Sequence, residues 1–449
     1  MSMKPVRRAL LGIGLAGLFA SPFSQAQAPQ VVRFLHNETD PPSIEFYTRA
    51  IAEFEKLNPG IKIEMEAVST DGRLQKVTAA INAKTMPEIF KLLSEERTVF
   101  ARKGYLVPLD NLVTAIGEGD YVAGSIERVD GKVYDLPYTL NGFSVLWYRN
   151  DLLKAANIAP PKTWDELRAA AKALNKGDTN GFIFPAGQNR MASLFLAQLM
   201  WSAGGTFFDK NLNVTFNNPG TIAALTLLRD LAPSSPKGVV SYSYGDMINV
   251  YLTGKIALDI YAPRLIATGY ATVPALAAQT NAAPMPAGPS GVGVKFLSPN
   301  GFAIASPAVG AKNTEAARKF LQYIVTGERL RDFSLTVFPH LVPPLKSVQQ
   351  AVIGAAKDKL GGRAGEIGRI SFDLSDALNF EDEAGATFTG GRVVKSGVGN
   401  PYIGPIVARH IPAQVVQRVV INGEDPKAAA AWGAEQLQKI VDDLKRTSR

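Results

Sequence analysis

Residues 31–65 constrain the fold of this chain more than any other segment. Residues 31–35 form a short apolar run typical of a buried strand, and apolar side chains alternate with charged ones in residues 61–65, as in a second strand. Between them, apolar residues recur at helical spacing from Ile44 to Phe54. A strand, a crossover helix and a second strand build a right-handed parallel unit. The sequence therefore predicts an α/β fold.

Length and charge narrow the class of protein further. A chain of 449 residues is too long for one ordinary hydrophobic core, so more than one domain is expected. Removing the three basic residues of the first 28, Lys4, Arg7 and Arg8, lowers the formal net charge from +8 to +5. No tight cluster of Lys and Arg with interleaved aromatic residues is present, which argues against nucleic-acid binding.

The first 28 residues are typical of a secretory signal peptide. A basic start is followed by an apolar run from Ala9 to Ala20 and by a polar end rich in small residues. The apolar run is too short to span a bilayer. The chain contains no cysteine, which excludes disulfides and thiolate sites and removes the residue that carries a lipid anchor. We therefore expect an exported periplasmic protein that is not lipid-anchored.

A stretch from Asp130 to Leu174 contains the most specific motifs. Thr163 and Glu166 have the spacing of a capping box, and the helix that they begin carries an apolar face. The segments DGKVY–LPY, WYRNDLL and PPKTWDEL, at this spacing, closely resemble the extracellular solute-binding proteins of family 1. These are the binding components of ABC importers for sugars and related solutes. FEKLNPGIKIE, FARKGYLVPLD and NVTFNNPGTIAAL extend the resemblance over nearly the whole mature chain.

The resemblance implies a fold and a function. The fold is the two-lobe, type II-like periplasmic binding protein, in which each lobe is a sheet flanked by helices, with a cleft and an interlobe hinge. The chain would then divide into an N-terminal lobe, residues 29–140 and 297–340, and a C-terminal lobe, residues 141–296 and 341–449. The implied function is to capture a sugar or sugar-like solute by hinge closure and to deliver it to the permease subunits of an ABC transporter. A monomer without a cofactor is expected.

The motifs of common enzymes are absent. His36, His340 and His410 lack the spacing of metal ligands, and the chain has neither a nucleophile elbow nor a phosphate-binding loop. The acidic run at residues 381–383 is predicted to be a solvated turn, because neighbouring carboxylates seldom face one substrate. We therefore expect no catalytic residue and no metal site. A secreted carbohydrate-active enzyme and a binding protein that feeds a sensor receptor remain the alternatives.

The resemblance also places candidate residues in the cleft. Aromatic rings would stack on sugar rings, while carboxylates, amides and arginine would bind hydroxyl groups. The predicted binding residues are Glu38, Asp40, Glu95, Asn141, Gln188, Asn189, Arg190, Tyr242, Tyr244, Tyr261, Arg264 and Asn300.

Several of these residues have an equally simple structural interpretation. Glu38 and Asp40 could form a solvated loop that caps the helix at Ser43, and Glu95 could be an exposed acid at a helix N-terminus. The run from Gln188 to Arg190 could likewise cap a helix.

Arg264 is a departure from the family pattern. It follows Ala262-Pro263 where the family commonly has Gly-x-Trp. This argues against a long, flat oligosaccharide site and favours a smaller polyol, an anionic sugar or a cation over a sugar ring. The structural alternative is an ion pair with Asp259.

Overall fold

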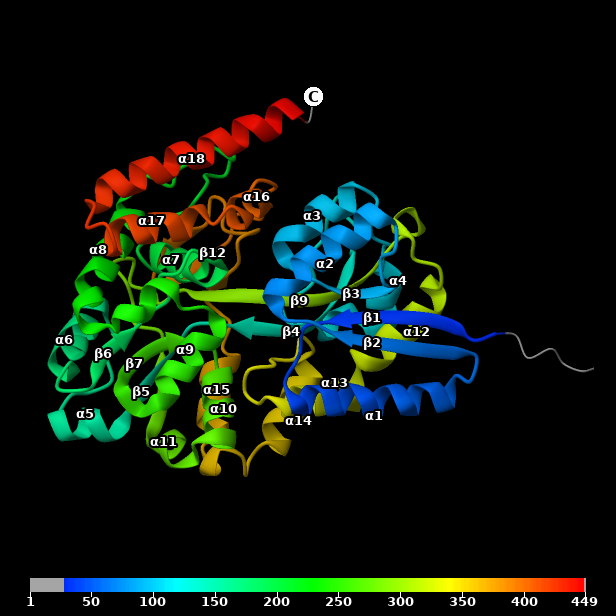
Figure 1. The fold of residues 1–449 in the computed structure, drawn as a ribbon, viewed down its shortest axis with the longest axis horizontal. Coiled ribbons are helices and arrows are strands. Elements are labelled where there is room, and N and C mark those ends of the chain that lie inside the picture. Colours follow the sequence, from blue (N-terminus) through cyan, green and yellow to red (C-terminus); the bar gives the residue numbers. More distant parts are fainter. Residues whose placement is uncertain (1–27, 448–449) are drawn as a thin grey trace, which may run out of the picture.

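The computed structural model describes residues 28–447, without the side chains of residues 70, 71, 95 and 447. The predicted signal peptide therefore lies outside the described residues, apart from Ala28. Two lobes lie side by side, and two long strands, β4 and β9, run between them (Figure 1). The predicted two-lobe α/β fold is confirmed, because solved maltose-binding-type proteins share this architecture.

The first lobe is built on a six-stranded sheet of order β10-β9-β3-β1-β2, in which β4 also pairs with β9. Strands β1, β2 and β3 are parallel, while β9 is antiparallel to both β3 and β4. The strand, helix and strand predicted from residues 31–65 are therefore confirmed. The strands are β1 (Gln30–His36), β2 (Ile61–Ala67), β3 (Ile89–Leu92), β4 (Asp135–Gly142), β9 (Lys295–Ile304) and β10 (Ala377–Leu378).

Helices cover the first sheet because their apolar faces match its buried residues. In α1, for example, Phe46, Tyr47, Ala50 and Phe54 are buried at helical spacing against β1 and the helices after β9. The helices of this lobe are α1 (Pro41–Leu57), α2 (Thr70–Ala83), α3 (Ser94–Arg102), α4 (Asp110–Ile116), α12 (Thr314–Ile324), α13 (Gly327–Thr336) and α14 (Lys346–Ala355), the last of which packs on α13.

The second lobe contains a four-stranded sheet of order β6-β7-β5-β8. Its strands are β5 (Val145–Arg149), β6 (Asn180–Ile183), β7 (Ile256–Tyr261) and β8 (Thr280–Pro284). Its helices are α5 (Asn150–Ala156), α6 (Trp164–Leu174), α7 (Arg190–Ser202), α8 (Pro219–Leu231), α9 (Tyr244–Val250), α10 (Arg264–Thr272), α11 (Pro274–Gln279), α15 (Ala364–Phe372), α16 (Ile403–Ala408), α17 (Ile411–Val420) and α18 (Pro426–Thr447). A hairpin of β11 (Thr387–Thr389) and β12 (Arg392–Val394) precedes α16.

Helix α6 begins where the sequence predicts. Thr163 is its N-cap and accepts a hydrogen bond from the Glu166 backbone N–H at 3.3 Å. Glu166 in turn accepts a hydrogen bond from the backbone N–H of Lys162 at 2.6 Å. The predicted apolar face is buried through Leu167 and Leu174. This helix therefore follows from local chemistry alone.

The chain first changes sheet between Gly142, the last residue of β4, and Val145, the first of β5. It returns through β8 and β9, and every residue of β4 and β9 is buried. After residue 340, α14 packs on the first lobe, β10 joins the first sheet, and α17 and α18 cover α7 and α8. The boundaries near residues 140, 297 and 340 stay predictions, because sheet membership alone does not define which residues move together.

Within residues 28–447, every helix is either too short or too polar to cross a membrane.

Candidate binding site at the junction of the lobes

Arg264 connects the two lobes directly. It is the first residue of α10 in the second lobe, and its two terminal nitrogens donate to carboxylates of the first lobe. Nη2 lies 2.9 Å from Glu38 Oε2, and Nη1 lies 3.0 Å from Asp40 Oδ2. The structural alternative of an Arg264–Asp259 ion pair is therefore wrong. The Asp259 carboxylate is fully buried and has no hydrogen-bond partner among the described residues.

Glu38 and Asp40 follow β1 at the carboxyl end of the parallel strands, the edge where open α/β sheets bind ligands. Asp40 caps α1 by accepting from the Ser43 N–H at 3.0 Å, so it has the predicted capping role in addition to its contact with Arg264. Glu38 is only 4% exposed, so the alternative of a solvated loop is wrong for this residue. Its Oε1 accepts from the Tyr138 hydroxyl at 2.9 Å.

A buried lysine lies beside this ion pair. Lys91 is on β3 and is 5% exposed, and its Nζ lies 6.0 Å from the centre of the Tyr138 ring. Burial lowers the pKa of Lys91 to about 8, with a further lowering from Arg73, Arg190 and Arg264, while Glu38 raises it. The lobes therefore bring basic and acidic groups together in a poorly hydrated space.

Two histidines in this region are neutral at pH 7. Burial lowers the pKa of His36 to about 4, and burial together with Arg264 and Lys91 lowers the pKa of His340 well below its ordinary value. His340 also lies edge-on to Phe143, with ring centres 6.4 Å apart. Both imidazoles can thus exchange hydrogen bonds with neutral polar groups without carrying charge.

Tyr244 and Tyr261 form the aromatic part of the junction on the side of the second lobe. Burial raises the pKa of Tyr244 to about 12, while Arg264 opposes this shift, which places the two side chains close together. The hydroxyl of Tyr261 donates to the Tyr244 carbonyl at 2.9 Å. Tyr261 is 1% exposed and its hydroxyl bonds to this backbone, so it supports Tyr244 rather than offering a free ring face.

Asn141 and Asn300 lie on β4 and β9, where the chain passes between the lobes. Both side chains are buried. Asn141 Oδ1 accepts from the Thr139 hydroxyl at 2.7 Å, and Asn300 Nδ2 donates to the Ser298 carbonyl at 3.1 Å. Each amide keeps further hydrogen-bonding capacity beyond this local bond.

The predicted run 188–190 begins α7. Asn189 is the N-cap: it accepts from the Ala192 N–H at 3.3 Å and donates to the carbonyl of half-buried Tyr242 at 2.9 Å. The capping role is therefore present. Gln188 is exposed, whereas Arg190 is partly buried and near enough to Lys91 to lower its pKa. Glu95 is in the first turn of α3, and its side chain lies outside the described part of the structure.

The junction thus brings together Glu38, Asp40, Arg190, Tyr244 and Arg264, and the two asparagines lie on the strands that run between the lobes. Sequence reasoning missed Lys91, Tyr138 and His340. For Lys91 a signal was present, because a charged residue interrupts the apolar run IFKLL at residues 89–93.

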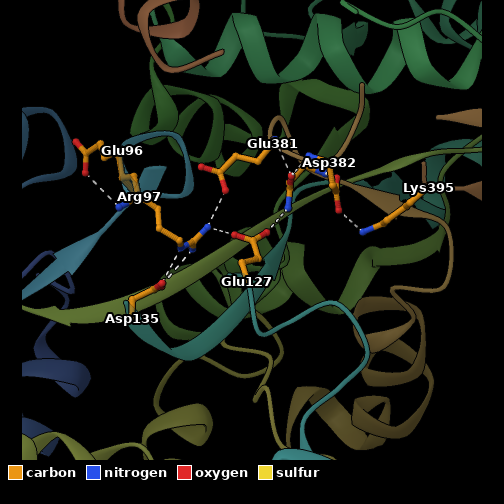
Figure 2. A network of polar contacts seen from close by, with 9 residues as sticks. Glu96, Arg97, Glu127, Asp135, Glu381, Asp382 and Lys395 are labelled. Atoms are coloured by element: carbon orange, nitrogen blue, oxygen red, sulfur yellow. Dashed lines mark hydrogen bonds and ion pairs between the residues drawn. The ribbon is translucent and has the colours of Figure 1, made fainter. Parts of the chain in front are cut away.

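The acidic run 381–383 is not a solvated turn, and that prediction is wrong. Arg97 of α3, itself 1% exposed, binds Glu381 at 2.8 Å, Asp135 at 2.6 Å and Glu127 (Figure 2). Glu383 is fully buried and accepts from the Phe207 N–H at 2.8 Å, and burial raises its pKa to about 8. The side chain of Glu381 is only 13% exposed and Glu383 is fully buried, because a distant arginine and a backbone N–H provide their partners.

Within the described residues, no cluster of three or more His, Asp or Glu side chains could hold a metal ion. Two cavities, of about 390 and 700 Å³, lie away from the junction and are lined by none of the predicted binding residues.

These features are those of a two-lobe solute-binding protein, and comparison with known families agrees. The family model described as bacterial extracellular solute-binding protein matches residues 40–328. The chain belongs to this family.

Two relatives show the same class. A protein of Brucella abortus (strain 2308) named as a binding protein is 28% identical over 316 residues, which cover 69% of this chain and 75% of that protein. A protein of Escherichia coli (strain K12) named as an ABC transporter periplasmic-binding protein is 23% identical over 242 residues, 52% of this chain and 56% of that protein. The chain is thus an ABC-transporter solute-binding protein, and its family and relatives are binding proteins rather than enzymes.

Solved structures share the fold. Maltose-bound MalE3 of T. maritima superposes with a TM-score of 0.76 at 19% identity, covering 91% of this chain and 99% of that chain. An ABC transporter solute-binding protein from Agrobacterium vitis S4 with bound D-mannitol superposes with a TM-score of 0.74 at 20% identity, covering 92% and 99%.

Proposed function

We propose that this protein captures a sugar or polyol between its lobes in the periplasm and delivers it to the permease subunits of an ABC importer. The observation that carries this proposal is the contact of Arg264 with Glu38 and Asp40, which joins groups of the two lobes 2.9 and 3.0 Å apart. Such contacts exist only when the lobes are together. A solute that touches both sides therefore favours the closed state.

The chemistry of the junction suits a solute with many hydroxyl groups. Glu38 and Asp40 offer carboxylate oxygens, and Asn141 and Asn300 offer buried amides. Tyr244 offers a hydroxyl on an aromatic ring. Hydroxyl groups of a sugar donate and accept at once, so they pair with such a mixed set. The two solved neighbours described above hold maltose and D-mannitol, which supports a carbohydrate-like solute.

The first test is a thermal-shift screen of the purified protein against sugars and polyols, followed by calorimetry on each hit. A ligand that binds only the folded state raises the melting temperature in proportion to the logarithm of its concentration over Kd. We expect a one-to-one hit whose ligand is recovered chemically unchanged. Turnover of the ligand would favour a secreted carbohydrate-active enzyme, and silence across the panel would contradict a carbohydrate solute.

The matched variants are Arg264→Ala and Arg168→Ala. Arg168 lies on α6, away from the junction, and its ion pair with Asp165 is mostly exposed. We expect Arg264→Ala to weaken binding of the hit and Arg168→Ala to leave it unchanged. Equal affinity in both variants would remove Arg264 from the binding site while leaving the family assignment intact.

A further inference from the structure

Among the described residues of the junction, Lys91 carries a charged group that has no hydrogen-bond or ion-pair partner. It is 5% exposed, and its Nζ makes no hydrogen bond or ion pair with any part of the chain that the structure describes. Desolvating an ammonium without a partner is costly, so such a group is normally paired when it is buried. The centre of the Tyr138 ring lies 6.0 Å from this Nζ.

The carboxylates near Lys91 already have other partners. Glu38 accepts from Tyr138 through one oxygen and from Arg264 through the other, at 2.9 Å each. Asp40 accepts from Arg264 and from the Ser43 N–H. The acidic groups described at the junction therefore balance Arg264 and do not bond to Lys91.

Two helices of the second lobe begin with arginine. Arg190 is the first residue of α7 and Arg264 the first of α10, and neither helix has an acidic residue in its first turn. Helix N-termini favour negative charge, and at α10 Glu38 and Asp40 supply it through their bonds with Arg264. Arg73, Arg190 and Arg264 all act on Lys91 electrostatically and lower its pKa, whereas Glu38 is the acid that raises it, so the surroundings of the lysine are rich in cations.

We propose that the solute is an acidic sugar or polyol whose carboxylate or phosphate binds the Lys91 ammonium. This inference rests on the proposed function and deepens it: Glu38 and Asp40 would bind hydroxyl groups, and Lys91 would select the anion. Carboxylates and phosphates share the chemistry that Lys91 recognises, because both accept charge-assisted hydrogen bonds from an ammonium.

The test compares matched neutral and acidic ligands by calorimetry. The panel is D-glucose with D-glucuronate and D-glucose 6-phosphate, D-galactose with D-galacturonate and D-galactose 6-phosphate, and D-mannitol with D-mannitol 1-phosphate. We expect one acid to bind at least about 10-fold more tightly than its neutral counterpart, the size of one charged hydrogen bond. The carboxylate and phosphate members of each set identify which anion fits.

Lys91→Met should remove that preference, lowering the affinity for the acid by about 10- to 100-fold. Lys319→Met is the control, because Lys319 is an exposed lysine on α12. Lys91→Met leaves no charged partner desolvated, so the variant should fold. Lys91→Arg keeps the charge and is the second variant, which should keep the preference for the acid.

The outcomes separate this inference from the proposed function. A neutral sugar or polyol that binds as tightly as its acid overturns the acidic solute and leaves carbohydrate capture standing. A preference for the acid that survives in Lys91→Met overturns the role of the lysine. Failure of every ligand, neutral and acidic, overturns both proposals together.

Discussion

Replacing Arg97 by methionine tests how strongly the polar network of Figure 2 holds the fold. Arg97 is 1% exposed and is the cation shared by Asp135, Glu381 and Glu127. Its Nε and Nη2 bind the two oxygens of Asp135 at 2.6 and 3.2 Å, and its Nη1 binds Glu381 at 2.8 Å. Methionine fills a similar volume without charge, so the variant leaves three poorly hydrated carboxylates without their cation.

Removing one partner of a buried ion pair costs about 3–5 kcal/mol, because the remaining charge stays desolvated. Arg97→Met should therefore lower the free energy of unfolding by about 3–5 kcal/mol at pH 7. The loss should be smaller at pH 5, because carboxylates that repel one another take up protons more readily. Urea unfolding followed by far-UV circular dichroism at both pH values measures this difference.

Arg102→Met is the matched control on the same helix. Arg102 binds Asp130 at 3.1 Å, but the two side chains are 55% and 64% exposed. Exposed ion pairs contribute little, so this variant should unfold at nearly the wild-type urea concentration. An Arg97→Met protein within about 1 kcal/mol of wild type, or an Arg102→Met protein that is equally destabilised, would refute the reasoning.

Three further predictions use other buried charges. Because the pKa of Lys91 is about 8, the Kd for a bound acid should rise by up to about 10-fold per pH unit above pH 8 in calorimetry. Lys91→Arg, whose guanidinium stays charged in this range, should abolish the rise. Burial raises the pKa of Asp259 well above 3.8, so its folded form keeps a proton that the unfolded chain releases. The contribution of Asp259 to the free energy of unfolding is then full below pH 4 and falls by up to about 1.4 kcal/mol per pH unit as the pH rises. Urea unfolding of wild type and Asp259→Asn at pH 5, 6 and 7 measures this fall, and a difference between the two proteins that does not change with pH would contradict it. Arg264→Met removes the ion pairs between the lobes, so its unliganded radius of gyration in X-ray scattering should exceed that of wild type, and an unchanged radius would show that other contacts hold the lobes together.

The sequence predicts those parts of the fold that depend on neighbouring residues. Alternating and helical apolar patterns predict β1, α1 and β2, and Thr163 with Glu166 predicts the start of α6. The division into two lobes came from motif resemblance. Local patterns do not specify which strands meet, and the pairing of β9 with β3, β4 and β10 joins segments from all parts of the chain.

In the candidate site too, the sequence does not show which distant residues meet. The sequence singles out Glu38, Asp40 and Arg264, but it offers Asp259, five positions before Arg264, as the obvious partner. In the structure Asp259 is inside β7, whereas Arg264 lies beyond the strand end and reaches carboxylates more than 200 positions away. Spacing in the sequence does not show whether Arg264 pairs with a nearby acid or with a distant one.

Burial of charged groups was the least predictable feature. Acidic runs are usually exposed, which is why residues 381–383 were predicted to be solvated. Their burial depends on Arg97, 284 positions earlier, and on a backbone N–H of the second lobe. Lys91 and Asp259 carry the same visible signal, a charge inside an apolar run, yet one faces the junction and the other the core of a sheet.

The bond between Arg97 and Glu381 also bears on the order in which the protein is made. Synthesis and export proceed from the N-terminus, so Arg97, Glu127 and Asp135 are delivered long before Glu381 and β10. Until those last residues arrive, the edge of β9 that pairs with β10 is open and the arginine lacks one of its three acids. A chain cut short before residue 377 therefore exposes an unpaired strand edge, the kind of surface through which incomplete proteins aggregate. Strand β10 and Glu381 thus complete the first lobe, whose other strands come from earlier parts of the chain.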